Sequence, residues 1–194
     1  MNSPTRRQKQ TSLSAQTHRI RLRVAEWSQQ GRKHWDIYRY LTDPYLLCDA
    51  VRLVIANGGA AGIDGQTVKD VKGREWEIAV SLSQQLAQGS YQSSAVRRVY
   101  IPKGNGEERP LGIPNLCDRV VQRAVCLLLE MIYEQKFHEF SYGFRPGRKA
   151  VDCVAELAKA VNTHRYVLEA DIEKFFDRVS HNKLLKLINK EIAD

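Results

Sequence analysis

The sequence predicts an α/β fold in which helices flank one short β-hairpin. Apolar residues recur at helical spacing in three long stretches, which are residues 44–57, 74–88 and 115–131. The apolar period changes to two over residues 96–101, which is typical of a strand. A second strand-like run at residues 166–168 ends just before Asp171. Helices and strands therefore alternate along one chain.

Composition and charge point to a globular protein with a polyanionic partner. The chain has 194 residues, of which 43% are hydrophobic, so it has enough apolar residues for a core. Its 30 Lys and Arg residues exceed its 22 acids and give a net charge of +8. Such a charge favours binding to nucleic acid or to an anionic membrane surface, and charge alone does not distinguish the two.

Cysteine usage and hydropathy favour a cytoplasmic protein. The four cysteines have no CxxC spacing and fall in apolar helical patterns, so we expect reduced core residues; they are Cys48, Cys117, Cys126 and Cys153. No apolar run approaches the roughly 20 residues that span a bilayer. No signal-peptide pattern is present, so we expect no membrane association.

The first 25 residues are basic and contain no acid. Two interpretations stay open for them, a transit-type segment and an RNA-contacting arm. Residues 14–28 alternate basic and apolar residues, which predicts a basic amphipathic helix. Its candidate RNA contacts are Arg19, Arg21 and Arg23. The alternative is a solvated surface helix.

Local signals define the next helices and a loop between them. Asp43 before Pro44 predicts a helix start, and Gly58 predicts its end. The loop GGAAGIDG, residues 58–65, is too rich in glycine for regular structure and is able to approach a nucleic-acid backbone closely. A plain connector is the alternative. Residues 74–88 predict a further helix with one apolar face.

The hairpin carries two candidate anion-binding residues. Its turn, residues 103–106, is LysGlyAsnGly, and residues 108–113 return as the second strand. Folding back brings Lys103 and Arg109 within reach of one anion. Arg grips phosphate oxygens as a fork and Lys acts as a point charge, as a triphosphate pocket requires. The alternative is a charged hairpin whose cations pair with Glu107 and Glu108.

Three more helices are expected in the second half of the chain. Asn115, with Asp118 three residues later, predicts a capped start for the longest helix. Ser180 predicts the cap of the last helix. Between them we expect a buried helix with the apolar face Val151, Val154, Ala155 and Ala158.

Two segments carry further candidate chemistry. The stretch SYGFRPGR, residues 141–148, is broken by Gly and Pro and offers side chains for base stacking and phosphate contact, namely Phe144, Arg145 and Arg148. Asp171 follows a predicted strand, and two-metal phosphoryl transfer uses carboxylates fixed at the ends of rigid elements. The alternative for Asp171 is a helix cap or turn former.

Five motifs occur together in a characteristic order: GIDG, RRVYIPKGNGEERPLGIP, DRVVQRAV, SYGFRPGR and LEADIEKFFDRVSH. This order resembles the fingers and first palm segment of group II intron reverse transcriptases, the intron-encoded maturases. The resemblance covers the chain from about Pro44 onward. It implies reverse-transcriptase fingers with a basic β-hairpin, an incomplete palm and an N-terminal helical extension. The implied divisions are 1–42 for the extension, 43–163 for the fingers and 164–194 for the start of the palm.

The resemblance also implies roles for individual residues. Asp171 would bind both catalytic Mg²⁺ ions, and Ile172 would offer its backbone carbonyl. Lys103 and Arg109 would hold the triphosphate, and Phe176 would lie under the sugar and exclude a 2′-hydroxyl. Further residues would lie near nucleotide, template or intron RNA: Phe144, Arg145, Gly62, Asp64, Arg97, Arg98 and Arg148. The implied partners are intron or template RNA, a DNA primer and deoxynucleoside triphosphates.

One departure from the family pattern affects activity. The second catalytic motif, an aromatic residue followed by Ala-Asp-Asp, does not occur, and no Asp-Asp pair exists in the sequence. One carboxylate does not hold two Mg²⁺ ions, and Glu169 is a poor substitute for acids on an opposing strand. We therefore expect this chain to be inactive alone, with a separate palm and thumb chain as a possible partner. The alternatives are a non-enzymatic RNA-binding splicing cofactor and an inactive fragment. A bacterial cytoplasm is the expected location, with an organelle as the alternative.

Overall fold

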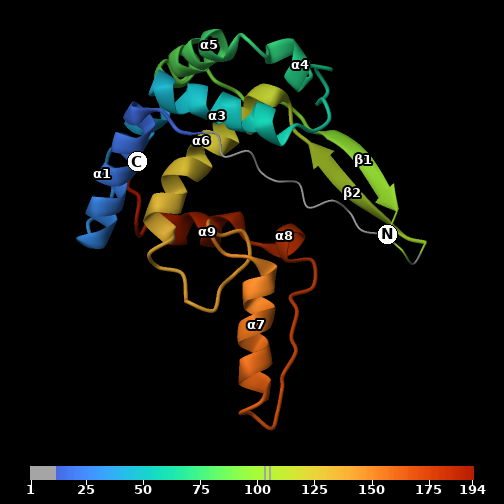
Figure 1. Cartoon of the computed structure of the whole chain (residues 1–194). Helices are drawn as coiled ribbons and strands as arrows, with labels where there is room; N and C mark the ends of the chain where they lie inside the picture. Colours follow the sequence, from blue (N-terminus) through green and yellow to red (C-terminus); the bar gives the residue numbers. More distant parts are fainter. Residues whose placement is uncertain (1–11, 103, 105) are drawn as a thin grey trace.

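The computed structural model describes residues 12–102, 104 and 106–194. The expectations for residues 1–11 and for Lys103 lie outside these residues. The described chain combines helices with one two-stranded antiparallel sheet, which confirms the mixed α/β class (Figure 1). In chain order the elements are α1 Ala15–Gln29, α2 Ile37–Leu41, α3 Pro44–Asn57, α4 Val68–Val71, α5 Glu75–Ala87, β1 Arg97–Pro102, β2 Glu108–Ile113, α6 Leu116–Tyr133, α7 Ala150–Val161, α8 Phe175–Arg178 and α9 His181–Ile188.

The core is built around α3. This helix packs against α1, α5 and α6, and in Figure 1 it lies between α5 and α6. Its inner face buries Leu46, Leu47 and Val51 completely, and α6 contributes Val120 and Leu127 to the same core. Burial of such side chains stabilises the fold by about 1.5–3 kcal/mol each. The N-terminal helices therefore form one packed unit.

Local capping explains the predicted start of α3. The Asp43 side chain accepts hydrogen bonds from the backbone N–H groups of Tyr45 (2.8 Å) and Leu46 (3.2 Å). Pro44 occupies the first turn, where its missing N–H leaves no donor unpaired. Gly58 ends the helix with a φ of +67°, a conformation that glycine adopts without strain. The predicted bounds of this helix are confirmed.

The basic N-terminal helix is also confirmed and is fastened to α3. The Ser14 side chain caps α1 by accepting a hydrogen bond from the Thr17 N–H. The Ser14 N–H donates to the buried carboxylate of Asp49 at 2.7 Å. Ile20 and Val24 enter the core. One face of α1 is thereby committed to packing.

The hairpin has the predicted antiparallel pairing. In its register Arg97 faces Ile113 and Ile101 faces Arg109. Directly paired residues share one face of a sheet. Both arginines therefore lie on the face that also carries the apolar pair Val99 and Leu111.

The predicted capping box of α6 is wrong, although the helix forms. Asn115 makes no side-chain cap hydrogen bond. Its Oδ1 instead accepts hydrogen bonds from the loop N–H groups of Ile63 (2.9 Å) and Asp64 (3.4 Å). Asp118 accepts hydrogen bonds from the Tyr91 hydroxyl at 2.6 Å and the Ser94 N–H at 3.2 Å. Both side chains therefore form hydrogen bonds with segments far away in the sequence, and not with the first turn of α6.

The predicted burial of α7 is wrong. The helix forms, but none of its residues is buried, and Val151 is 75% exposed. In Figure 1 α7 extends away from the α3 core. An amphipathic helix buries its apolar face only where another element packs against it, and the described elements leave this face open.

The predicted strand at 166–168 is also wrong. The segment is irregular, and Tyr166 and Leu168 are 91% and 93% exposed. A strand requires backbone hydrogen bonds from a neighbouring strand, and the described sheet contains only β1 and β2. Asp171 therefore does not stand at the end of a strand in this structure.

The end of the chain returns to the N-terminal helices. Ser180 caps α9 as predicted, by accepting a hydrogen bond from the Lys183 N–H. His34 then pairs with the last residues: its N–H donates to the Glu191 carbonyl, and the Ala193 N–H donates to the His34 carbonyl, both at 2.7 Å. Ile192 is buried against the core.

Among the helices of the described chain, none is long and apolar enough to cross a membrane.

Candidate functional site

Asp171 lies in an open, irregular segment between α7 and α8. The residue is exposed, and so is the adjacent Ile172, at 68%. Lys174 then adopts a left-handed φ of +49°, which turns the chain into α8. No group of three or more His, Cys, Asp or Glu residues in the described ranges is placed to hold a metal ion. A carboxylate oxygen is a suitable ligand for Mg²⁺, but the Asp171 carboxylate alone provides too few oxygen atoms to hold two ions.

Two aromatic side chains are exposed just after Asp171. Phe176 is 84% exposed and Phe175 is 50% exposed, and their rings meet edge to face with centroids 5.7 Å apart. Exposed phenylalanines are unfavourable in water and are typical of a contact surface. Phe176, five residues after Asp171 in the sequence, is therefore accessible to a ligand.

The hairpin arginines point to solvent. Arg97, Arg98 and Arg109 are exposed, and none has an ion pair with another described residue. In the alternative interpretation, Lys103 and Arg109 pair with Glu107 and Glu108; Arg109 forms no ion pair with Glu108, and the part of this interpretation that concerns Lys103 is not tested. Because Lys103 lies outside the described residues, the joint Lys103 and Arg109 anion site stays a prediction.

The 141–148 segment is organised by Arg145. The guanidinium donates to the Glu134 carboxylate (Nη2 to Oε1, 2.8 Å) and to the carbonyls of His138 and Ser141, both at 2.8 Å. It also lies over the Phe137 ring, 5.3 Å from its centroid. Only 6% of the Arg145 side chain is exposed. Its guanidinium is therefore engaged within the protein, and its nucleotide contact stays a prediction.

The neighbours of Arg145 are presented to solvent. Phe144 has a left-handed φ of +58° and is fully exposed. Such a backbone conformation is strained for a bulky residue and persists only where the surroundings enforce it. Arg148 donates to the Glu139 carbonyl at 2.9 Å and lies over the Tyr142 ring at 5.3 Å. Of the three predicted contacts in this segment, Phe144 is the most accessible.

The GIDG loop is packed against the start of α6. Gly62 is buried, and a Cβ atom there would lie 2.1 Å from Oδ1 of Asn115. Asp64 is exposed, and its Oδ1 accepts a hydrogen bond from the Gln66 N–H at 3.1 Å. Close packing against Asn115 therefore explains why residue 62 is a glycine. In this loop only Asp64 and its exposed neighbours are accessible to a nucleic acid.

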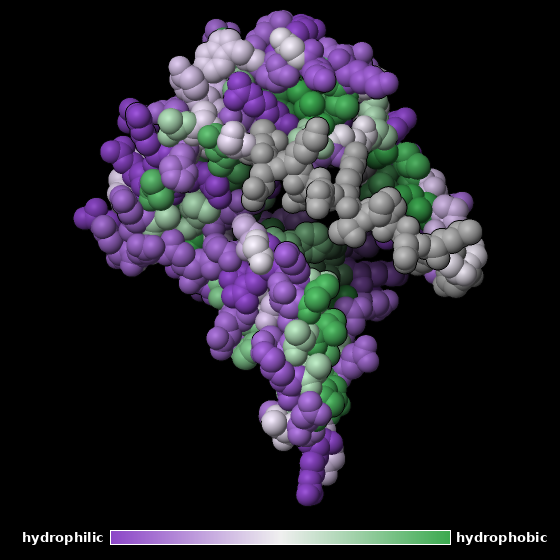
Figure 2. Space-filling view, in the orientation of Figure 1, coloured by the Kyte–Doolittle hydropathy of each residue, from purple (hydrophilic) through white to green (hydrophobic). Residues whose placement is uncertain are grey.

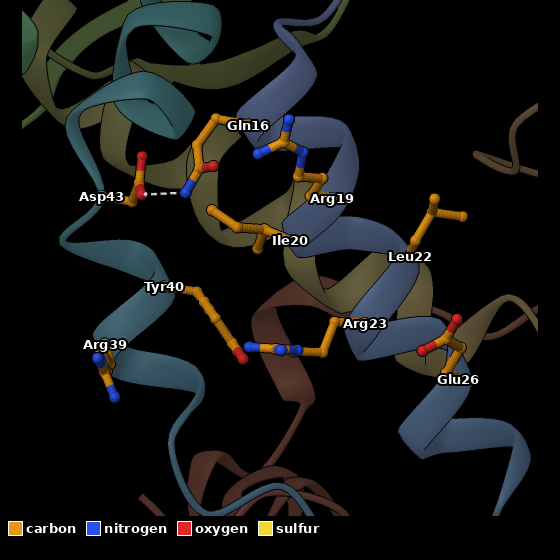
Figure 3. A pocket seen from close by; sticks show the side chains of 9 residues that line it. All are labelled: Gln16, Arg19, Ile20, Leu22, Arg23, Glu26, Arg39, Tyr40 and Asp43. Atoms are coloured by element: carbon orange, nitrogen blue, oxygen red, sulfur yellow. Dashed lines mark hydrogen bonds between the residues drawn. The ribbon is translucent and has the colours of Figure 1, made fainter.

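Two of the three predicted α1 arginines line a cleft of about 560 Å³. Arg19 and Arg23 approach it from α1, and Arg39 and Tyr40 approach it from α2 (Figure 3). Arg21 lies elsewhere, because it forms an ion pair with Glu130 at 3.3 Å. Among the described residues, the lining holds three arginines and two acids, Glu26 and Asp43, and in Figure 3 the Arg39 side chain extends away from Arg19 and Arg23. The cleft therefore has a small excess of positive charge, which favours an anionic partner.

Sequence reasoning missed Arg39 and Tyr40, because α2 is too short to show a clear periodicity. It also missed Arg119 and Arg123, which line a second cavity. Their spacing of four residues places them on one face of α6, a signal that was present in the sequence.

The cysteines show no sign of redox chemistry. All four are free thiols, and Cys48 alone is fully buried. Burial raises the pKa of the Cys48, Cys117 and Cys126 thiols, so they stay protonated and unreactive near neutral pH. The expected core position is confirmed for Cys48, whereas Cys117, Cys126 and Cys153 are only partly buried.

Known proteins are similar to this chain over most of its length. A family model for reverse transcriptase (RNA-dependent DNA polymerase) matches residues 101–194. Protein YkfC of Escherichia coli is 39% identical over 165 residues, which cover 81% of this chain and 43% of that protein. The group II intron-encoded protein LtrA of Lactococcus lactis is 37% identical over 161 residues, which cover 81% of this chain and 26% of LtrA.

Residues 101–194, just under half of the chain, match the reverse transcriptase family, and over this region the chain belongs to that family. Its similarity to LtrA and to a yeast COX1 intron 2 protein, at 33% identity over 113 residues, places it with the group II intron-encoded proteins. The chain spans less than half the length of these curated relatives.

Proposed function

We propose that this chain provides the fingers and the first part of the palm of a group II intron reverse transcriptase. Its role would be RNA-directed DNA synthesis in intron mobility, with assistance to intron splicing. The observation that carries the proposal is the reverse transcriptase match, which begins near the end of β1, at Ile101, and includes Asp171. Residues 1–42 would form the N-terminal extension, 43–163 the fingers and 164–194 the start of the palm.

The proposed chemistry is attack of a primer 3′-hydroxyl on the α-phosphate of a deoxynucleoside triphosphate. The new phosphodiester bond replaces the bond between the α-phosphorus and the bridging oxygen, pyrophosphate leaves, and the hydroxyl proton passes to water. Mg²⁺ ions would stabilise the charge on the reacting phosphate. Asp171, with the carbonyl of Ile172, would contribute to their site. Because the described carboxylates do not suffice for two ions, the opposing acids must come from outside this set of residues. The exposed, irregular state of residues 166–172 supports a site that is completed by further strands.

Other residues of this chain would position the substrates. Lys103 and the exposed Arg109 would neutralise the triphosphate, and Phe176 would block a 2′-hydroxyl by its bulk. Template or intron RNA would contact two groups of residues. The first group is the α1 cleft with Arg19 and Arg23. The second group comprises the remaining candidates Asp64, Arg97, Arg98, Phe144, Arg145, Arg148 and Arg21. Gly62 is buried, so its part would be to shape the GIDG loop and not to contact RNA. A bacterial cytoplasm is the proposed location, because YkfC and LtrA are bacterial proteins.

Primer extension on an RNA template tests the proposal. The chain is mixed with Mg²⁺, deoxynucleotides and a separately expressed carboxy-terminal palm and thumb segment of a group II intron reverse transcriptase. We expect activity only in the mixture, and its loss in Asp171→Ala. Asp177→Ala on the exposed α8 is the matched control and should stay active. No extension in any mixture of folded components would contradict the proposal.

The second candidate is an RNA-binding splicing cofactor without polymerase activity. The cleft lined by Arg19, Arg23 and Arg39 favours it, because RNA binding needs no metal site. Intron RNA binding with a steep salt dependence, in the absence of any primer extension, would support this candidate. Equal weak binding to every RNA would argue against it.

A further inference from the structure

The cavity beside the C-terminal end of α3 contains unpaired arginine donors. It has a volume of about 270 Å³ and is lined by Val54, Asn57, Gly58, Arg119, Gln122, Arg123 and Cys126. Among the described residues that line it, two are arginines and none is acidic. A water molecule occupies about 30 Å³ of liquid, so the space is large enough for several waters or for one phosphate group.

Arg119 is incompletely satisfied within the described chain. Its Nη1 donates to the Gly58 carbonyl at 3.3 Å, which places the charge at the negative end of the α3 dipole. Nε and Nη2 of the same guanidinium are buried and have no hydrogen-bond partner among the described residues. A guanidinium carries five N–H donors, and leaving buried donors of a charged group unpaired is costly. The contact with α3 therefore accounts for only one of the three nitrogen atoms of this guanidinium.

The glycine loop is shaped around this guanidinium. A Cβ atom on Gly59 would lie 2.8 Å from Nη1 of Arg119, and Gly59 has a φ of +116°. A residue with a side chain would be strained at that φ and would also displace the guanidinium. The loop thus leaves room for a guanidinium whose Nε and Nη2 have no partner among the described residues.

Arg123 adds a second, only partly neutralised charge. Its Nη1 lies 3.3 Å from Oε1 of Glu130, but Glu130 also pairs with Arg21 at 3.3 Å. One carboxylate therefore serves two arginines. Nε of Arg123 is buried without a partner among the described residues. Arg123 and Arg119 are four residues apart on α6, so both face the same cavity.

We propose that Arg119 and Arg123, with Gln122 at the rim, form a binding site for a phosphate group. Paired guanidinium groups bind phosphate oxygens through forked, charge-assisted hydrogen bonds. Because Nε and Nη2 of Arg119 are buried, this side chain would have to turn toward the cavity for these donors to reach a phosphate. That the phosphate belongs to an RNA strand rests on the proposed function. The recognition chemistry itself does not, because it is equally suited to a free phosphate.

Binding of a single-stranded RNA oligonucleotide, measured at several salt concentrations, tests the site. Gln122 is exposed, so Gln122→Glu places a repelling carboxylate at the rim without disturbing the interior. We expect about 10-fold weaker RNA binding in this variant, with a salt slope smaller by about 0.7 for one lost phosphate contact. Gln84→Glu on α5 makes the same charge change away from the cavity lining and should match the wild type.

A second measurement uses inorganic phosphate as the probe and thermal unfolding as the readout. A ligand that binds only the folded state raises its melting temperature. Phosphate should stabilise the wild type and Gln84→Glu but not Gln122→Glu or Arg119→Gln. Stabilisation by phosphate without any effect on RNA binding would support the site and identify a free anion as its ligand. Wild-type RNA binding and phosphate response in Gln122→Glu would overturn the proposal. Neither result decides the outcome of primer extension, so failure of this site and failure of the proposed function can be told apart.

Discussion

Gly62 packs directly against Asn115, so the GIDG loop lies in close contact with the start of α6. A Cβ atom on Gly62 would lie 2.1 Å from Oδ1 and 2.8 Å from the backbone nitrogen of Asn115. The same Oδ1 accepts the Ile63 N–H at 2.9 Å. The GIDG loop is therefore positioned by α6, although more than fifty residues separate them.

Gly62→Ala should lower the free energy of unfolding by about 1–3 kcal/mol, because the new methyl group must displace backbone atoms. Urea unfolding of the purified chain measures this change. Gly143→Ala is the control, since a Cβ there meets nothing within 4 Å, and it should shift stability by less than about 0.5 kcal/mol. Equal stabilities of the two variants would contradict the packing argument.

Arg145→Lys should destabilise the fold by about 1–3 kcal/mol, because an ammonium group does not reproduce the two-pronged contact with Glu134. The same change at Arg148, whose guanidinium donates one hydrogen bond to a carbonyl, should have a smaller effect. Thermal unfolding of both variants measures the difference. A larger loss in Arg148→Lys would show that Arg145 does not organise the segment.

Stability should fall as the pH drops below 6.5, because His34 is held neutral in the fold. Burial lowers the pKa of His34 from its usual value of 6.5, although the nearby carboxylates of Glu191 and Asp194 oppose this shift. In acid the unfolded chain binds a proton that the folded chain does not, so the free energy of unfolding decreases with falling pH.

Denaturant unfolding between pH 7.5 and 5 measures this dependence. His34→Gln should reduce the slope, and His138→Gln, at an exposed site, should retain it. An undiminished slope in His34→Gln would assign the acid sensitivity to other groups. Because His34 pairs with residues 191–193, the C-terminal segment should be the first to detach.

The exposed apolar side chains of α7 and α9 should make this chain self-associate. Figure 2 shows hydrophobic residues gathered along the part of the molecule that contains α7. On α9, Leu184 is 42% exposed and Leu187 is 57% exposed. Replacing both leucines with lysine should shift sedimentation toward monomer, because it removes apolar surface.

Leu22→Lys on α1 is the matched control, since this leucine is 50% exposed but lies on another helix. It should leave the association unchanged. A wild-type chain that is monodisperse, monomeric and cooperatively folded would contradict the prediction.

The helices that were predicted correctly are those with self-contained end signals. Asp43 and Pro44 begin α3 through contacts within four residues, and Ser180 begins α9 in the same way. Such signals act before any tertiary contact exists, so the sequence alone reveals them. The hairpin was predictable for the same reason, because its turn and its alternation are local.

The errors occurred where a side chain or a face found its partner far away in the chain. Asn115 matched a helix cap by spacing but hydrogen-bonds to the loop at Ile63. The apolar face of α7 matched a buried helix by spacing, but no described element packs against it. Residues 166–168 had a strand composition but have no strand beside them among the described residues.

The sequence by itself determined the family, the helix and hairpin signals and the basic charge, because all of these depend on residue order and type. The tertiary structure decided which polar groups are available. It pairs Arg21 and Arg145 with carboxylates and exposes Arg109 and Phe176. Within the described part of the chain, it leaves two nitrogen donors of Arg119 without a partner. Burial and hydrogen-bond partners depend on elements that meet only in the folded chain, so no local pattern encodes them.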